Sequence, residues 1–358
     1  MKKRKITIYD IARELNVSPS TVSRALKDHH SISKKTKKAV LKIVKETGYK
    51  PNVLAASLRN NKTNTIGVII SEINRPFISS LISGVEIAAN KAGYNVIICQ
   101  SHDSFEKEVA NAQSLYASRV EGLVVSLAME TCNYDHFYQF MENDIPVVFV
   151  DRVPEEVPSD KVVIDNYSAG YRATEHLIEQ GCRRIAHFGG SQIRNIYRER
   201  QSGYIDALKK YNLEIDENLI INTYVTSAEE GFKMTRQLMS LDKPPDGIFS
   251  ANDTSAVSAI KFAKQAGINV PKDLAVIGFN NDPISLIIDP ELSTVTHPAV
   301  EMGKIAAHQV LDHKKNKEIV SNRTTVLETE LIIRQSSMRI SQVKKPMTDG
   351  NLGSYLKV

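Results

Sequence analysis

Two short helical patterns of apolar residues lie near the start of the chain, in TIYDIARELNVSPSTVSRALK at residues 7–27. Their apolar positions recur three or four residues apart and are Ile8, Ile11, Ala12 and Leu15 in the first pattern and Val22, Ala25 and Leu26 in the second. Thr7 and Ser18 stand where an N-cap belongs, and Pro19 falls at the first helical position, where a missing N–H has no helical partner to lose. The pattern predicts two one-faced helices joined by a tight turn, the second beginning at Ser18.

From Thr65 onward, short β-branched runs alternate with helical patterns. The runs are IGVII at 66, NVIIC at 95, GLVVS at 122 and PVVFV at 146, and then, in a second series, KVVID at 161, RIAHFG at 184, LIINTY at 219, GIFS at 247 and LAVIGF at 274. The helical patterns occupy residues 77–91, 105–118, 167–180, 199–211, 228–240 and 253–266. This alternation predicts two doubly wound α/β lobes, with a ligand expected in the cleft beyond the carboxyl ends of their strands.

Composition narrows the class of protein. The 358 residues are 42% hydrophobic and 24% charged, which is enough for two or three globular domains. The basic start MKKRK resembles a signal peptide, but Asp10, Arg13 and Glu14 interrupt the apolar stretch that should follow, and no segment approaches about 20 apolar residues. We therefore expect a soluble cytoplasmic protein with no membrane partner.

The charge of the chain is divided unevenly. Residues 1–62 hold 16 Lys and Arg against four Asp and Glu, a net charge of +12, and the rest holds 30 against 37, a net charge of −7. A field concentrated in about a sixth of the chain is typical of a module that binds a polyanion. A solvated basic surface is the alternative, and the overlap with the two helices favours nucleic acid.

The second predicted helix has the chemistry of a DNA reader. Its polar face carries Ser20, Thr21, Ser23 and Arg24, which supply short donors and one guanidinium for base edges and phosphates in a major groove. An ordinary helical hairpin is the alternative interpretation. Together with the charge, the pattern indicates a helix-turn-helix domain that binds double-stranded DNA.

Motifs for catalysis, metals and cofactors are poor. Gly189 and Gly190 follow a strand, but the chain has no GxGxxG, no Walker lysine and no GxSxG, and its nine His are scattered without ligand spacing. Cys99, Cys132 and Cys182 are odd in number and far apart, so neither a disulfide framework nor a metal site is expected. We expect no catalytic residue, no metal and no cofactor.

Several motifs match one family in order and spacing. They are TIYDIARELNVSPSTVSRALK, TGYKPNVLAASLR, TNTIGVII, RQSGYIDAL, SANDTSAVSAI, VIGFNNDP, LSTVTHPAVEMGKIAA and LIIRQSS. From about residue 6 to 337 the chain resembles the lactose-repressor (LacI/GalR) family of bacterial transcription regulators. The resemblance implies an all-α helix-turn-helix headpiece, a periplasmic-binding-protein-like core of two lobes, a homodimer and a near-palindromic operator.

The resemblance also implies a hinge between headpiece and core. Asn52–Arg59, with about eight residues, is too short for a helix that is stable alone. In the family this segment pairs with its dimer mate in the minor groove, and Leu58 matches the inserted wedge; a small contact with the core is the alternative for Leu58. The expected DNA-contacting residues are Thr7, Ser18, Pro19, Ser20, Thr21, Ser23, Arg24, Asn52, Ala55 and Leu58. Pro19 replaces a base-contacting side chain of many relatives, and its ring cannot donate.

Five residues match effector-binding positions of the family. They are Phe77, Asp151, Arg200, Asn252 and Asn280. Asn280 departs from the usual Asp, which exchanges a pure acceptor for an amide that also donates. A surface salt bridge is the alternative for Arg200 and a packing role is the alternative for Phe77, beside which Arg75 is unusual.

The expected domains follow from these matches. They are 1–50 (DNA-binding domain), 51–62 (hinge), 63–163 with 292–322 (N-terminal lobe), 164–291 with 323–338 (C-terminal lobe) and 339–358 (disordered tail). We expect a DNA-binding repressor, not an enzyme, controlled by a small metabolite between the lobes, with a sugar or sugar phosphate first. A nucleobase or phosphoprotein effector is one alternative, and a sugar kinase fused to a helix-turn-helix is another.

Overall fold

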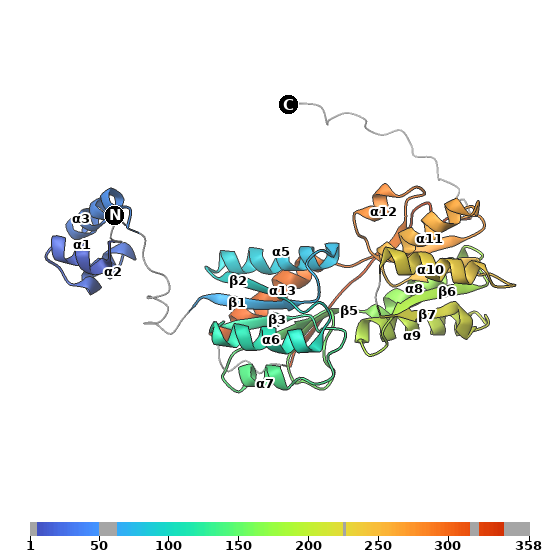
Figure 1. Ribbon diagram of the computed structural model, residues 1–358, viewed down its shortest axis with the longest axis horizontal. Helices are drawn as coiled ribbons and strands as arrows, with labels where there is room; N and C mark the ends of the chain where they lie inside the picture. The colour runs from blue at the N-terminus through green and yellow to red at the C-terminus, as the bar shows by residue number, and fades with distance from the viewer. Residues whose placement is uncertain (1–5, 50–62, 225–226, 316–321, 340–358) are drawn as a thin grey trace, which may run out of the picture. The chain divides into compact units, whose positions relative to one another are not determined.

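The structure, a computed structural model, describes residues 6–49, 63–224, 227–315 and 322–339 (Figure 1). It divides into two units, Met1–Thr63 and Asn64–Val358, which are described separately below. The predicted hinge residues Asn52, Ala55 and Leu58 lie outside the described residues, as does the expected tail beyond Arg339. Among the described helices, none is both long and apolar enough to cross a bilayer.

The first unit is a three-helix domain. Its helices are α1 (Ile8–Glu14), α2 (Pro19–Leu26) and α3 (Lys34–Thr47). The apolar faces that the sequence predicted meet in one small core, which buries Ile11, Ala12, Val22, Ala25, Val40 and Ile43. Asn16 takes a left-handed φ of 51° in the turn between the first two helices. The two predicted helices and their caps, Thr7 and Ser18, are confirmed.

The first lobe of the second unit contains a six-stranded parallel sheet, in the order β11-β5-β4-β3-β1-β2. Its strands are β1 (Thr65–Ile70), β2 (Asn95–Gln100), β3 (Gly122–Val125), β4 (Val147–Val150), β5 (Asp160–Ile164) and β11 (Thr324–Leu327). Helices α5 (Pro76–Lys91) and α13 (Ala299–Lys315) pack on one face with Ile66 and Val68. Helices α6 (Phe105–Ala117) and α7 (Asp135–Met141) pack on the other face with Ile69 (Figure 1).

The second lobe repeats this plan in the sheet order β12-β10-β9-β8-β6-β7, in which only β12 is antiparallel. Its strands are β6 (Ile185–Gly190), β7 (Ile220–Thr223), β8 (Gly247–Ser250), β9 (Ala275–Asn280), β10 (Ser293–Thr296) and β12 (Leu331–Ile332). Helices α8 (Asn166–Glu179) and α9 (Asn195–Lys210) pack on one face, and α10 (Ala228–Met239) and α11 (Asp253–Gln265) on the other. A 3₁₀ turn, η1 (Glu217–Leu219), precedes β7, and α12 (Ile284–Ile287) follows β9.

All nine predicted runs form strands, and the six predicted helices are present, α9 beginning four residues earlier than predicted. The structure places three features differently. The strand at 161, which opened the second predicted series, belongs to the first sheet. Residues 293–296, expected in the first lobe, pair with β9 in the second, and residues 324–327, expected in the second lobe, pair with β5 in the first. Strand pairing, rather than any local pattern, decides these memberships.

The chain therefore passes between the lobes three times, after β5, after β10 and after β11. These connections bring the carboxyl ends of strands from both sheets to one region. A close crossing of α8 and α9 fixes part of that region, because a Cβ on Gly170 would lie 2.3 Å from the Arg200 carbonyl oxygen and one on Gly203 would lie 2.2 Å from the Tyr167 carbonyl oxygen. The glycines hold the backbone of Arg200 against α8.

Candidate functional site

The first candidate site is the exposed end of α2. Ser18 caps the helix, with its Oγ accepting a hydrogen bond of 3.1 Å from the backbone N–H of Thr21. The same Oγ lies 2.7 Å from Ser20 Oγ and 2.9 Å from Thr21 Oγ1, so three predicted DNA-contacting hydroxyls form one cluster. Such a cluster presents donors and acceptors together at a helix N-terminus, where anions are also favoured.

The rest of the α2 surface matches the predicted division of faces. Val22 and Ala25 are buried in the domain core, whereas Ser20 and Arg24 are exposed. Thr7 is also exposed and closes a capping box with Asp10, in which its backbone N–H and hydroxyl both donate to the carboxylate, at 2.9 and 2.6 Å. A rigid cap at each helix start orients the polar face of α2.

Helix α3 adds positive charge to this domain. Its exposed lysines are Lys34, Lys35, Lys38, Lys42 and Lys45. Lys37 is instead directed to the end of α2, where its Nζ lies 2.6 Å from Asp28 Oδ1 and lowers the pKa of that carboxyl by hydrogen bonding and charge. The domain thus combines a polar helix face with a basic surface, as a DNA-binding module requires.

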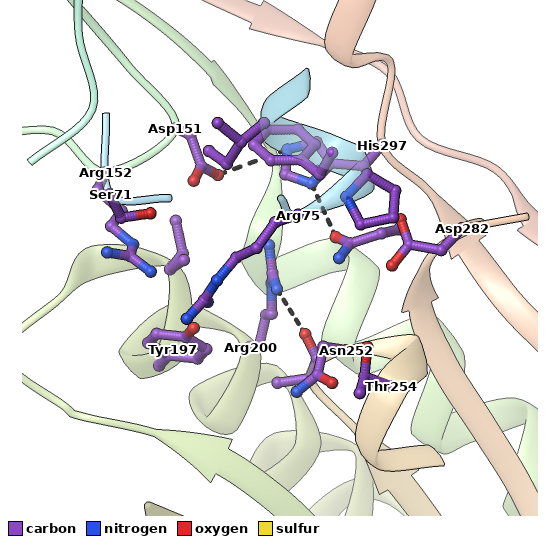
Figure 2. Close-up of a pocket in the computed structure, with 16 residues that line it drawn as sticks. Ser71, Arg75, Asp151, Arg152, Tyr197, Arg200, Asn252, Thr254, Asp282 and His297 are labelled. Carbon is purple, nitrogen blue, oxygen red and sulfur yellow. Dashed lines mark hydrogen bonds and ion pairs between the residues drawn. The ribbon is translucent and has the colours of Figure 1, made fainter. Parts of the chain in front are cut away.

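The second candidate site is a cavity between the lobes of the second unit, with about 640 Å³ of empty space that includes a mouth open to solvent (Figure 2). All five residues predicted to bind an effector line it: Phe77, Asp151, Arg200, Asn252 and Asn280. Phe77 comes from the start of α5, Arg200 from α9, and the other three from the ends of β4, β8 and β9.

Arg200 is the most deeply held of these side chains, with 2% of its surface exposed. Its Nε donates to Asn166 Oδ1 at 2.9 Å, and its Nη1 donates to the Ala251 carbonyl oxygen at 2.9 Å. Nη2 is buried without a hydrogen-bond partner. Burial lowers the pKa of the guanidinium to about 10, although nearby Asp151 opposes the shift, so the group is charged at neutral pH. The surface salt bridge considered from sequence does not describe Arg200.

Asp151 and His297 face each other across the cavity wall. Asp151 follows β4 in a left-handed conformation with φ 63°, and its Oδ1 lies 3.5 Å from His297 Nε2. Both atoms are buried and have no hydrogen bond. Burial raises the pKa of Asp151 against the opposing effect of Arg200, and burial with the charge of Arg200 lowers the pKa of His297 well below its usual value.

Three contacts position the His297 ring. It stacks on Phe77 with ring centres 3.9 Å apart and meets the edge of Phe279 at 5.9 Å. Its Nδ1 lies 3.1 Å from Asn280 Oδ1. Phe77 therefore packs against His297, as the alternative considered from its sequence position expected, and also lines the cavity.

Two further guanidinium groups line the cavity and already face carboxylates. Arg152 Nη1 lies 2.5 Å from Asp103 Oδ1, and this charge raises the pKa of the guanidinium further. Arg75 Nε lies 3.3 Å from Glu72 Oε2, and its Nη2 lies 3.8 Å from Asp103 Oδ2. Arg75, which was only noted as unusual, is thus part of the cavity.

Besides Arg75, sequence reasoning missed six polar lining residues: Ser71, Arg152, Tyr197, Thr254, Asp282 and His297. Arg152 directly follows Asp151, and Asp282 lies two residues beyond Asn280, so both stood beside predicted strand ends. His297 lies on the second connection between the lobes. No hydrophobic pattern marks that connection, and only the pairing of β10 with β9 reveals it.

The cavity offers hydrogen-bonding groups and an aromatic wall. Within the described residues, no group of three His, Cys, Asp or Glu side chains is arranged to hold a metal ion. Cys99, Cys132 and Cys182 form no disulfide. The arrangement can bind a polar small molecule between two lobes.

Family models match both units. The model described as bacterial regulatory proteins, lacI family, matches residues 7–52, and a periplasmic binding protein-like domain matches residues 174–337. The HTH-type transcriptional regulator RegA of Clostridium saccharobutylicum is 33% identical over 336 residues, covering 93% of this chain and 99% of the relative. The HTH-type transcriptional repressor CytR of Escherichia coli strain K12 is 32% identical over 331 residues, covering 92% and 96%.

Solved structures are similar over nearly the whole chain. A crystal structure of the lac repressor dimer bound to operator and the anti-inducer ONPF has a TM-score of 0.83 at 23% identity and covers 94% of this chain and all of the other. A complex of the transcriptional regulator CelR with cellobiose has a TM-score of 0.69 at 29% identity and covers 92% and 99%. The first similarity supports the fold, and the second extends to a regulator with a sugar ligand.

Proposed function

The chain belongs to the lacI family of bacterial regulatory proteins and is a DNA-binding transcriptional regulator rather than an enzyme, and we propose that it is a homodimeric repressor controlled by a sugar or sugar phosphate. The observation that supports effector control most directly is the cavity between the lobes. It gathers all five residues that the family resemblance assigned to an effector, from both lobes. A ligand that contacts both lobes favours one arrangement of them over another, as allosteric control requires.

The DNA-binding role of the headpiece is proposed residue by residue. Ser20 and Thr21 set base preference, Arg24 holds the backbone or a base, and the capped N-termini of α1 and α2 approach phosphates. Asn52, Ala55 and Leu58 lie outside the described residues, and their minor-groove role rests on the resemblance alone.

A homodimer is supported by an exposed apolar helix. In α12, Ile284, Leu286 and Ile287 expose 41%, 58% and 80% of their surfaces. Aliphatic residues exposed together in this way are typical of an interaction surface. A second copy is the occupant that a two-fold operator requires, because each half-site is read by one α2. Light scattering of the full chain tests the dimer.

Selection of bound duplexes from a random DNA library at near-physiological salt tests the operator. The dimeric reader predicts a two-fold symmetric consensus. If nothing is enriched with the chain alone, the selection is repeated with a pool of metabolites, which supplies a missing corepressor. Absence of enrichment in both contradicts the proposed DNA specificity.

Thermal shift of the full chain tests the effector class. Sugars, sugar phosphates and purines are added in turn, because a ligand at 100 times its Kd stabilises the folded state by about 2.7 kcal/mol. A shift with purines alone points instead to the nucleobase effector. Release or tightening of the selected operator by the same ligand gives the direction of control.

A further inference from the structure

The orphaned atoms of the cavity wall form one connected group. Asp151 Oδ1, His297 Nε2 and Arg200 Nη2 are all buried without a hydrogen-bond partner. A buried polar atom left unpaired is unfavourable, so each of these atoms is a place where a ligand atom stabilises the complex. The neighbours of each atom determine whether it accepts or donates a hydrogen bond.

The contact with Asn280 determines which nitrogen of His297 donates a hydrogen bond. The Asn280 side chain places its amide oxygen, Oδ1, toward the His297 ring, and an amide oxygen can only accept a hydrogen bond. That Oδ1 lies 3.1 Å from His297 Nδ1, which must therefore donate. In a neutral imidazole one nitrogen donates and the other accepts, so His297 Nε2 carries a lone pair. Figure 2 shows His297 between Asp151 and Asp282.

This assignment leaves two acceptors side by side. His297 Nε2 and Asp151 Oδ1 are 3.5 Å apart and cannot bond without a proton between them. The charged groups that face the ring are Asp151 from the end of β4 and Arg200 from α9, with Asp282 beyond Asn280; the positive charge of Arg200 and the burial of the ring keep His297 neutral. At this point of the wall two acceptors lack a donor, and Arg200 Nη2 is a donor without an acceptor.

Resting on the function proposed above, we infer that the Asn280–His297 relay selects an uncharged, hydroxyl-rich effector over its phosphate ester, because the ligand must bring donors to His297 Nε2 and Asp151. Adjacent hydroxyls supply both donors, and a hydroxyl oxygen also accepts from Arg200 Nη2. A phosphate dianion brings acceptors only and would leave Asp151 and His297 without partners.

The other guanidinium groups do not compensate an anion here. Arg152 is bonded to Asp103 and also donates to the Leu127 carbonyl oxygen at 3.3 Å. Arg75 lies beside Glu72 and Asp103. A phosphate in the cavity would approach the carboxylates of these pairs as well as that of Asp151. The charges of the wall thus disfavour an anionic ligand, in agreement with the two acceptors that need donors.

Calorimetric titration of the full chain with matched probes tests the inference. The probes are ribose, glucose, fructose and cellobiose, each beside its phosphate esters. We expect at least one neutral sugar to bind 100-fold or more tightly than its esters. If an ester binds more tightly than its parent sugar, the inference is overturned while the sugar-effector function stands. If no member of any pair binds, the sugar-effector function itself fails, and the inference fails with it.

Two variants test the residues of the relay. His297→Phe keeps the ring stacked on Phe77 and removes the Nε2 acceptor, so affinity for the neutral sugar should fall about 10-fold or more with little change in unfolding temperature. Asn280→Asp places a carboxylate on Nδ1, which favours a protonated His297 whose Nε2–H then bonds Asp151. The affinity of this variant for the neutral sugar should be low at pH 6 and recover as pH rises, whereas the affinity of the unaltered chain should stay constant over the same pH range.

A merely structural role for Asn280 would lower affinity equally at every pH. That result, or an unaltered affinity in His297→Phe, would overturn the relay. Ser114→Ala, at an exposed position of α6, is the matched control, because Ser114 Oγ donates to the Ala110 carbonyl oxygen and does not line the cavity.

Discussion

The Cζ atom of Arg200 lies 3.6 Å from the centre of the Phe279 ring. A guanidinium over an aromatic face is attracted by the ring quadrupole, more strongly when both are removed from water. With the bonds to Asn166 and Ala251, this contact fixes Arg200 before any ligand arrives. Only Nη2 remains for the effector.

Replacement of Arg200 by Lys should therefore damage both stability and ligand response. An ammonium keeps the charge but cannot reach Asn166 and Ala251 in the same geometry, which leaves two buried acceptors unpaired. We expect a loss of about 2–4 kcal/mol in the free energy of unfolding, measured by urea denaturation, and no thermal shift with the effector. Lys209→Ala, an exposed position on the same helix, should change stability by less than about 0.5 kcal/mol. Equal effects of the two would remove Arg200 from its assigned role.

Loss of the α2 cap should weaken binding to every DNA sequence. Ser18→Ala removes the acceptor for the Thr21 N–H, which costs about 1 kcal/mol of helix stability. Hydrogen exchange in α2 should accelerate, and affinity for operator and for random DNA should fall together. Ser20→Ala leaves the cap intact and should alter base preference instead. A change of preference in Ser18→Ala without faster exchange would contradict the capping role.

Arg24 should act through charge on the DNA. Arg24→Ala should weaken binding and lower the slope of log affinity against log salt by about one. Titrations of operator at four salt concentrations measure this slope. Lys91→Ala removes the same charge from α5 in the second unit and should leave the slope unaltered. An unchanged slope in Arg24→Ala would argue against a phosphate contact.

The proposed wedge role of Leu58 predicts unequal losses of affinity for operator and for random DNA. Leu58→Ala should weaken operator binding far more than binding to random DNA, because the wedge acts only in the bent, paired complex. Competition titrations with the two DNAs give the ratio. Equal losses on both would contradict a wedge.

Stability should depend on pH through His187. The ring is buried, stacked near Tyr204 and Phe249, and donates from Nδ1 to the Phe249 carbonyl oxygen. Burial lowers its pKa from 6.5 to about 4. The unfolded chain thus binds the extra proton first, so the stabilisation is full above pH 6.5 and is lost as pH falls toward 4, by up to about 3 kcal/mol.

Urea denaturation at pH 7 and pH 5, with His187→Gln as the comparison, measures this dependence. Asp253 opposes it, because burial raises the pKa of that carboxyl to about 8 and its stabilisation is lost as pH rises. That contribution is common to both proteins and cancels in the comparison. A pH dependence as steep in His187→Gln as in the unaltered chain would assign the effect to other groups.

Local patterns determined the elements that could be predicted from sequence. Runs such as IGVII and LAVIGF are continuous and β-branched, and every one formed a strand. Strand β10, with the sequence STVT, and strand β11, with TTVL, mix polar and apolar residues and carry no such signal. Strand β11 belongs to the first lobe because it pairs with β5, more than 100 residues earlier in the chain. Strand β10 belongs to the second lobe because it pairs with the preceding strand, β9.

The cavity residues likewise divide into those that local sequence patterns could place and those that they could not. Asp151, Asn252 and Asn280 follow predicted strands, so their place at the sheet edge could be inferred. His297 enters the cavity because β10 pairs with β9 and the chain then crosses to α13, and no local pattern specifies that path. Likewise, the contact of Asn280 with His297 depends on side-chain geometry that a sequence pattern does not contain.

The late exchange of segments between the lobes has a consequence for synthesis on the ribosome. The headpiece builds its core from residues 8–49 and can close as soon as they emerge. The first lobe instead awaits α13 and β11, which end at Lys315 and Leu327. At about 5–20 residues per second, that interval is roughly 15–60 s. During it the face of α5 that contains Leu81 and Val85 has no α13 to cover it, so the nascent regulator carries a complete headpiece core beside an incomplete core in the first lobe.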